Sequence, residues 1–237
     1  MGPANYVTPI PDGLDSASAA PLLCAGVTSY AALRRTQARS GQWIVISGAG
    51  GGLGHIAVQL AKEMGLRVIG IDHGSKEGFV KECGSEVFLD ITKHDDKSIV
   101  EEVKKTTGGL GVSAAMVCTA SNKAYAQAVD FLRFGGTLVC VGVPEGKLEP
   151  IASAFPTSVV FKQLTIAGTA VGNRKDAAEV LDFAVRGVVK IHTRIEPLEK
   201  LDDVSIINST DTTPKADEFF FYRYFRKCPP ANWSAES

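Results

Sequence analysis

The residues best suited to chemistry lie in the glycine-rich segment SGAGGGLGH, at positions 47–55. Gly48, Gly51 and Gly54 follow a GxxGxxG spacing, one residue longer than the standard GxGxxG spacing of dinucleotide-binding proteins. Glycines lack a Cβ, so the backbone there can turn sharply and approach a ligand closely. Free N–H groups at the start of a following helix would then face a pyrophosphate. Because a purely structural glycine-rich turn could have the same spacing, this signal alone is weak.

Asp72 strengthens the signal, since it stands 18 residues after Gly54 at the end of the next predicted strand. An acidic residue at that point accepts hydrogen bonds from the adenosine ribose hydroxyls and repels a 2′-phosphate. The two features together predict an NAD site rather than an NADP site. The alternative, that Asp72 is only an exposed carboxylate at a strand end, stays open. No Lys-Ser or Lys-Thr pair follows the glycines, so the segment is not a P-loop.

The remaining ionisable residues carry less information. His55 is expected on the surface, in the first turn of the helix that follows the glycines. The four histidines have no metal-ligand spacing, and the five cysteines have no CxxC pair. A disulfide framework is therefore not expected, and a reducing cytoplasmic setting is the default. Three cysteines are interpreted as small buried hydrophobic residues: Cys83, Cys118 and Cys140.

The elements that must position these residues alternate between strands and helices. An α/β protein with a doubly wound parallel sheet, a Rossmann-type cofactor domain, is therefore predicted. The predicted strands are 42–48, 66–72, 86–90, 114–119, 135–142 and 164–172. The predicted helices are a first one with an apolar face from Leu53 to Met64, then 76–83, 95–106, 122–133 and 174–186, with another around Val27 to Leu33 near the start.

Composition limits the classes of partner. The 237 residues include 25 Lys and Arg and 26 Asp and Glu, so the formal net charge is 25 − 26 = −1. With no basic block, neither nucleic acid nor a membrane surface is an expected partner. No run of 18 apolar residues occurs, so no transmembrane helix is expected, and the first residues lack the features of a signal peptide.

Four separated blocks of the sequence resemble the zinc-dependent medium-chain alcohol dehydrogenases, in particular the NAD-linked tetrameric type of fungi and bacteria. The resemblance runs from about Tyr6 to Leu201. The blocks that carry it are AAPLLCAGVTSYAAL (19–33), SGAGGGLGHIAVQLAKEMGLRVIGID (47–72), FLRFGGTLVCVGVP (131–144) and VGNRKDAAEVLDFAVRG (171–187).

The resemblance implies roles for matching residues. It makes Cys24 a ligand of a catalytic zinc and places Asp72 and Lys76 at the adenosine ribose. Ala170 departs from the pattern, because the family usually has a bulky aromatic residue there. The pyrophosphate loop would comprise Gly48, Gly51, Gly52, Leu53 and Gly54. The cofactor groove would be lined by Thr119, Val141, Val143, Thr169 and Val171, the last four on the nicotinamide side.

The resemblance also divides the chain. Residues 1–30 match a remnant of the family's GroES-like catalytic domain, and 31–200 match the NAD-binding domain. Residues 201–237 depart from the family and are expected to be a poorly ordered tail. The other zinc ligands and the proton relay of the family would lie in the part of the catalytic domain that this sequence lacks, so Cys24 is one ligand where a catalytic zinc needs three.

The activity implied by the resemblance is NAD-dependent oxidation of small primary alcohols to aldehydes. Zinc would act as a Lewis acid in the complete enzyme, which would be a homotetramer. The present chain is expected to keep mainly the cofactor-binding part and to have little activity alone. Two alternatives stay open: a zinc-free medium-chain quinone or enoyl reductase, and a non-catalytic NAD-binding or interaction module.

Overall fold

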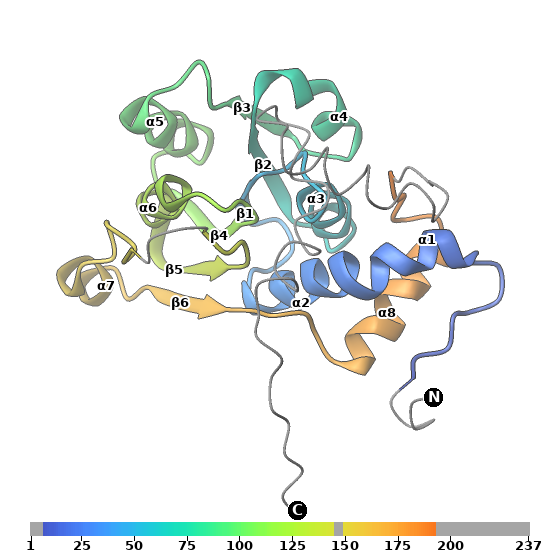
Figure 1. Ribbon diagram of the computed structural model, residues 1–237. Coiled ribbons are helices and arrows are strands. Elements are labelled where there is room, and N and C mark those ends of the chain that lie inside the picture. The colour runs from blue at the N-terminus through green and yellow to red at the C-terminus, as the bar shows by residue number, and fades with distance from the viewer. Residues whose placement is uncertain (1–6, 145–148, 193–237) are drawn as a thin grey trace, which may run out of the picture. The chain divides into compact units, whose positions relative to one another are not determined.

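The computed structural model describes residues 7–144 and 149–192, which form a parallel sheet covered by helices on both faces. The strands lie in the order β3-β2-β1-β4-β5-β6 (Figure 1), so the predicted doubly wound α/β fold is confirmed. The predicted tail, 201–237, and the end of the predicted cofactor domain lie outside the described residues. The strands are β1 (Trp43–Ser47), β2 (Arg67–Asp72), β3 (Val87–Asp90), β4 (Val112–Val117), β5 (Leu132–Cys140) and β6 (Thr165–Gly168).

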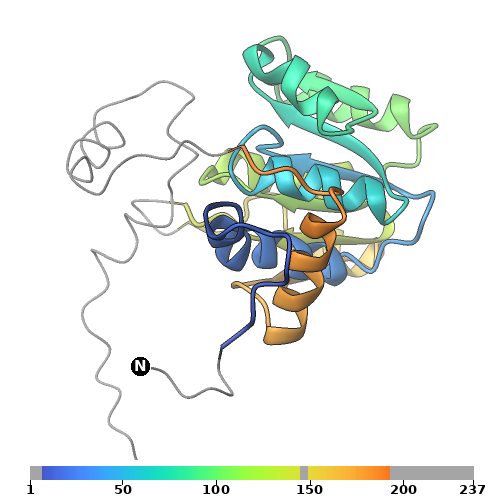
Figure 2. The same cartoon turned by 90° about the vertical axis from the view of Figure 1, so that its right-hand side faces the viewer.

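Two apolar cores separate the helices into layers. Alternate residues of a strand face opposite sides of the sheet, so Ile44 and Ile46 of β1 belong to one core and Val45 to the other. The first core is covered by α2 (Val27–Arg35), α3 (Gly54–Glu63), α4 (Glu77–Glu82) and α8 (Arg174–Val185). The second is covered by α5 (Asp96–Thr106) and α6 (Asn122–Phe131), and these two layers can be followed in Figures 1 and 2.

Side-chain caps fix the starts of α5 and α8. The Asp95 carboxylate accepts hydrogen bonds from Lys97 N and Ser98 N, which satisfies two of the free N–H groups of α5. At α8, Asn173 and Asp176 form a reciprocal capping box.

The first helical segment of the chain runs without interruption through α1 (Ser16–Pro21), the π-helical turn η2 (Leu22–Gly26) and α2. By length and composition alone, Ser16–Arg35 could cross a membrane. Its residues Leu22 and Leu33 are fully buried in the first core, as in the core helix of a compact domain. Figure 1 shows this segment beside α8. The predicted boundary after residue 30 falls inside it.

Side-chain bonds attach this segment to α8. Arg34 Nη1 lies 2.5 Å from Asp176 Oδ1, and the Tyr30 hydroxyl donates to Glu179 at 2.7 Å. The Arg34 pair ties the segment to the capping carboxylate of α8.

The last strand is shorter than its apolar sequence predicts. β6 ends at Gly168, and Thr169 N donates one more bond to Cys140 O at 3.1 Å. Val171 then has φ of 54°, a conformation that an extended strand excludes. The strand prediction over 164–172 is therefore wrong in its last four residues. Two short helices were also not predicted, α1 and α7 (Pro156–Phe161), because each lacks a full apolar period.

Candidate functional site

The glycine loop, residues 48–54, follows β1, which pairs with β2 on one side and β4 on the other. The chain adds β2 and β3 on one side of β1 and then β4, β5 and β6 on the other, so the order of the strands reverses at β1. In folds of this type, ligands bind at the carboxyl ends of the strands where that reversal occurs. Gly48 has φ of 77°, and Gly51 N donates to Gly48 O at 3.1 Å. The loop leads directly into the N-terminus of α3, whose first N–H groups have no carbonyl partner within the helix.

Close packing explains why the loop needs glycines. A Cβ added at Gly54 would overlap Gly48 O, and one at Gly48 would lie 2.5 Å from Thr119 Cγ2. A Cβ at Gly50 would lie 2.7 Å from Cδ of Lys76. Gly48, Gly50 and Gly54 thus form a tightly packed cradle in which side chains would clash. The N–H groups of residues 48–51 already donate within the protein, so a close anionic ligand would meet the N–H groups that follow, at the start of α3.

Asp72 lies beside this cradle and is only 8% exposed. Its Oδ2 accepts Gly50 N at 2.7 Å, its Oδ1 accepts His73 N at 2.7 Å, and Lys76 Nζ lies 3.7 Å from Oδ1. The alternative of an exposed strand-end carboxylate is therefore wrong. A carboxylate has about four acceptor positions, so Asp72 keeps capacity for further donors such as ribose hydroxyls.

Thr119 adds a second polar group to the cradle. Its Oγ1 and His55 Nε2 are the buried side-chain polar atoms without a hydrogen-bond partner in the described part of the chain. Thr119 follows β4 and packs against both Gly48 and Gly142, where an added Cβ would contact it. A buried hydroxyl without a partner is costly, so this atom is suited to a polar ligand that reaches the glycine loop.

The expectation of a surface position for His55 is wrong. The side chain is 6% exposed, and its Nδ1–H donates to Gly51 O at 2.8 Å, so it supports the glycine loop from beneath. Its ring also lies near Phe79 and His192, with centroid distances of 5.7 and 5.9 Å. Burial lowers the pKa of His55, which favours the neutral ring.

The residues predicted for the nicotinamide side lie after β5 and β6, at the same edge of the sheet as the glycine loop. Val143 is 47% exposed and Val171 is 36% exposed, whereas Val141 and Thr169 are half-buried. Their roles stay predictions, as do those of Gly52 and Leu53, which lie half-buried in the loop.

Cys24 lies in the π-helical turn η2 and is half-buried. Burial raises the pKa of its thiol, which favours the protonated form over the thiolate that binds zinc. Residues 7–144 and 149–192 contain no group of three or more His, Cys, Asp or Glu side chains that could hold a metal ion. The described residues therefore do not fit a catalytic zinc site.

The prediction that three cysteines are buried hydrophobic residues holds fully for Cys83, while Cys118 and Cys140 are half-buried. Desolvation and then the nearby charge of Asp72 raise the pKa of Cys118 to about 12, so this thiol stays protonated at neutral pH.

Two residues of the site were not found from the sequence. Ser29 Oγ donates to Leu53 O at 2.9 Å and so joins the first helical segment to the glycine loop. Asp90, the last residue of β3, pairs in register with Asp72 of β2. A strand ending in aspartate, as both β2 and β3 do, was the available signal for Asp90.

Comparison with known proteins agrees with this arrangement. The family model described as "Zinc-binding dehydrogenase" matches residues 52–186, more than half of the chain. The chain belongs to the zinc-binding dehydrogenase family.

Relatives of this chain are named alcohol dehydrogenases. Alcohol dehydrogenase 2 of Emericella nidulans is 61% identical over 210 residues, which are 86% of this chain and 57% of that protein. An alcohol dehydrogenase of Schizosaccharomyces pombe is 45% identical over 85% of this chain and 56% of its own length. The chain therefore spans little more than half the length of these relatives.

Among solved structures, the alcohol dehydrogenase of the archaeon Aeropyrum pernix has a TM-score of 0.70 at 31% identity. The match covers 81% of this chain and 54% of the archaeal chain. The resemblance found in the sequence is thereby confirmed at the level of the family.

Proposed function

We propose that this chain binds NAD through the glycine loop and Asp72, and that the reaction served by this cofactor in the complete family enzyme is the oxidation of small primary alcohols to aldehydes. The observation that carries the proposal is the pairing of a cradle that excludes a Cβ at Gly48, Gly50 and Gly54 with a buried carboxylate beside it. The names of the relatives support the alcohol as substrate class.

The described residues fit this cofactor. The N–H groups at the end of the loop and the N-terminus of α3 would stabilise the two negative charges of the diphosphate. Asp72 would accept hydrogen bonds from the ribose hydroxyls and repel a 2′-phosphate, with Lys76 close to its other side. Thr119 Oγ1 would gain the polar partner it lacks. When bound, NAD supplies the hydride acceptor for alcohol oxidation.

Zinc takes no part in what is proposed for these residues, because the described ranges contain no group of three or more side chains that could hold it together with Cys24. The proposal for this chain alone is therefore cofactor binding with little or no turnover. A zinc-free reductase of the quinone or enoyl type is disfavoured by Asp72, since such enzymes usually lack the acidic residue and prefer NADPH.

Self-association is a further part of the proposal, with a second copy as the partner. In the described part of the chain β6 is the last strand of the sheet, and large apolar side chains are exposed on and near it. Unpaired strand edges and apolar patches favour association. The exposed residues are Phe134, Phe155, Val160, Phe161 and Ile166. Sedimentation should show a dimer or tetramer, and Ile166→Glu should shift it toward the monomer.

The test of cofactor binding is a calorimetric titration of the purified chain with NADH and with NADPH. We expect binding of NADH and an affinity for NADPH at least about tenfold weaker, the effect of one unfavourable charge contact. A parallel assay with ethanol and NAD should show little or no turnover. A folded chain that gives no heat with NADH contradicts the proposal, and a preference for NADPH favours the reductase alternative.

A further inference from the structure

The turn that follows Asp72 has an acceptor for each of four successive backbone N–H groups. His73 N donates to Asp72 Oδ1, and Gly74 N donates to Asp90 Oδ1 at 3.0 Å. Ser75 N donates to His73 Nδ1 at 3.2 Å, and Lys76 N donates to His73 O at 2.9 Å. Three of these acceptors belong to residues 72–73, whereas Asp90 reaches the turn from the neighbouring strand β3.

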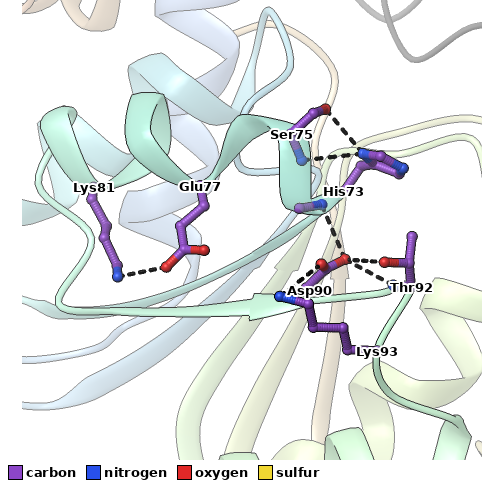
Figure 3. Close-up of polar contacts among 8 residues, drawn as sticks. His73, Ser75, Glu77, Lys81, Asp90, Thr92 and Lys93 are labelled. Carbon is purple, nitrogen blue, oxygen red and sulfur yellow. Dashed lines mark hydrogen bonds and ion pairs between the residues drawn. The ribbon is translucent and has the colours of Figure 1, made fainter.

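Asp90 is itself held firmly (Figure 3). It is 7% exposed, and its Oδ1 also accepts Thr92 N at 2.9 Å and Thr92 Oγ1 at 2.7 Å. Its Oδ2 lies 3.7 Å from Lys93 Nζ, and a Cβ on Gly74 would overlap this oxygen. Bonds from Thr92 lower the pKa of Asp90, so its carboxylate is charged at neutral pH and accepts strongly.

Strand register places the two aspartates side by side. Asp72 and Asp90 are Cα partners at the ends of β2 and β3, and Ile91 N donates to Asp72 O at 3.0 Å. Residues directly opposite one another on neighbouring strands project to the same face of the sheet. Asp90 accepts the N–H of Gly74, two residues after Asp72, and so fixes the path of the backbone that leaves Asp72.

We propose that Asp90 is a positioning residue for NAD: it fixes the turn 73–76 so that Asp72 stays free to accept the adenosine ribose hydroxyls. The inference rests on the proposed function and extends it to a residue that would not touch the cofactor. Asp90 acts through Asp72, so removing Asp90 should weaken NADH binding only while Asp72 is present.

The test is a double-mutant cycle on the full chain, read by calorimetric titration with NADH. Asp90→Ala should weaken NADH binding about tenfold, the effect of one misplaced hydrogen bond to a charged acceptor. In an Asp72→Ala background the same change should weaken binding less than about twofold, because coupled residues are not additive. Asp90→Asn should restore affinity to within about threefold of the unaltered chain, since its amide oxygen can still accept from Gly74 and Thr92.

A matched control is Asp95→Ala, which also removes a carboxylate that accepts two backbone N–H groups, but at the start of α5. It should lower the melting temperature and leave NADH affinity unchanged. If Asp90→Ala does not fold, Thr92→Val takes its place in the cycle, with an expected loss of about threefold.

The outcomes separate two failures. No binding of NADH by the unaltered folded chain overturns the proposed function and this inference with it. Normal binding by the unaltered chain, together with an unchanged affinity in Asp90→Ala or equal losses with and without Asp72, overturns the role of Asp90 alone. A loss in Asp90→Asn as large as in Asp90→Ala also overturns it.

Discussion

The two sides of the candidate site are built differently. The ribose side, which comprises the loop 48–54, Asp72, Lys76 and Asp90, is mostly buried and joined by hydrogen bonds between β1, β2 and β3. The nicotinamide side, which comprises Val141, Val143, Thr169 and Val171, follows β5 and β6 and is largely half-buried or exposed. The difference indicates that affinity for a dinucleotide should reside mainly in its adenosine diphosphate half, because that half meets groups already held in place.

The largest loss of NADH affinity on the ribose side is expected from a substitution at Gly54. In Gly54→Ala, the new Cβ overlaps Gly48 O, so the loop must move and NADH binding should weaken roughly hundredfold or more. Calorimetric titration with NADH measures this loss. Gly78→Ala is the control, because a Cβ on that glycine of α4 meets no atom within 4 Å. Gly78→Ala should keep full affinity and be slightly more stable; equal losses in both variants would contradict the cradle.

Asp72→Asn tests the charge of the ribose side with little change in volume. We expect NADH to bind roughly ten- to fiftyfold more weakly, since a hydrogen bond to a charged acceptor becomes one to a neutral amide. NADPH should lose much less affinity, so the ratio of the two dissociation constants should fall. An unchanged ratio in parallel titrations would show that Asp72 does not select between the two cofactors.

His55→Gln tests whether the buried, neutral ring of His55 makes the stability of the ribose side depend on pH. The pKa of His55 is lowered from 6.5 in the folded chain, so the unfolded chain binds more protons just below that value. Stability present above pH 6.5 should therefore fall as the pH drops toward the folded pKa, by at most about 1.4 kcal/mol per pH unit. Urea unfolding at pH 7.5 and 5.5 should show a smaller fall in His55→Gln.

His94→Gln is the control for the loss of a histidine that has no bond to the loop. A fall in stability between pH 7.5 and 5.5 that is the same in His55→Gln as in the unaltered chain would contradict the role assigned to His55.

The smallest expected effect lies on the nicotinamide side. Val171 has φ of 54°, which is unfavourable for a branched residue, so Val171→Gly should raise the free energy of unfolding by about 1 kcal/mol. Val143→Gly removes the same side chain at a more exposed position without that strain and should lower stability instead. Thermal unfolding measures both, and neither change should affect affinity for ADP-ribose. A loss of stability in Val171→Gly would show that its conformation is not strained.

The sequence indicates the ribose side better than the rest of the molecule for a physical reason. A GxxGxxG turn between a strand and a helix is visible in the local sequence, because only glycines allow the backbone conformation there. Asp72 follows at a spacing set by the length of one helix and one strand. His55 was misplaced because Phe79 and His192, which bury it, come from distant segments. Asp90 belongs to no motif, since its role depends on the register of β3 beside β2.

The end of β6 shows the opposite limit. The apolar run 164–172 has the composition of a strand throughout, yet the backbone leaves the sheet after Gly168. An apolar, β-branched composition indicates a buried strand. It does not indicate where a single residue such as Val171 takes a positive φ and ends the strand.

The central claim is tested most directly by calorimetric titration of the folded chain with ADP-ribose and, separately, with nicotinamide mononucleotide. If the described residues bind the adenosine diphosphate half, ADP-ribose should bind within about tenfold of NADH, and the mononucleotide should give no measurable heat at the same concentrations. Tight binding of the mononucleotide, or no binding of ADP-ribose by a chain that binds NADH, would contradict the claim.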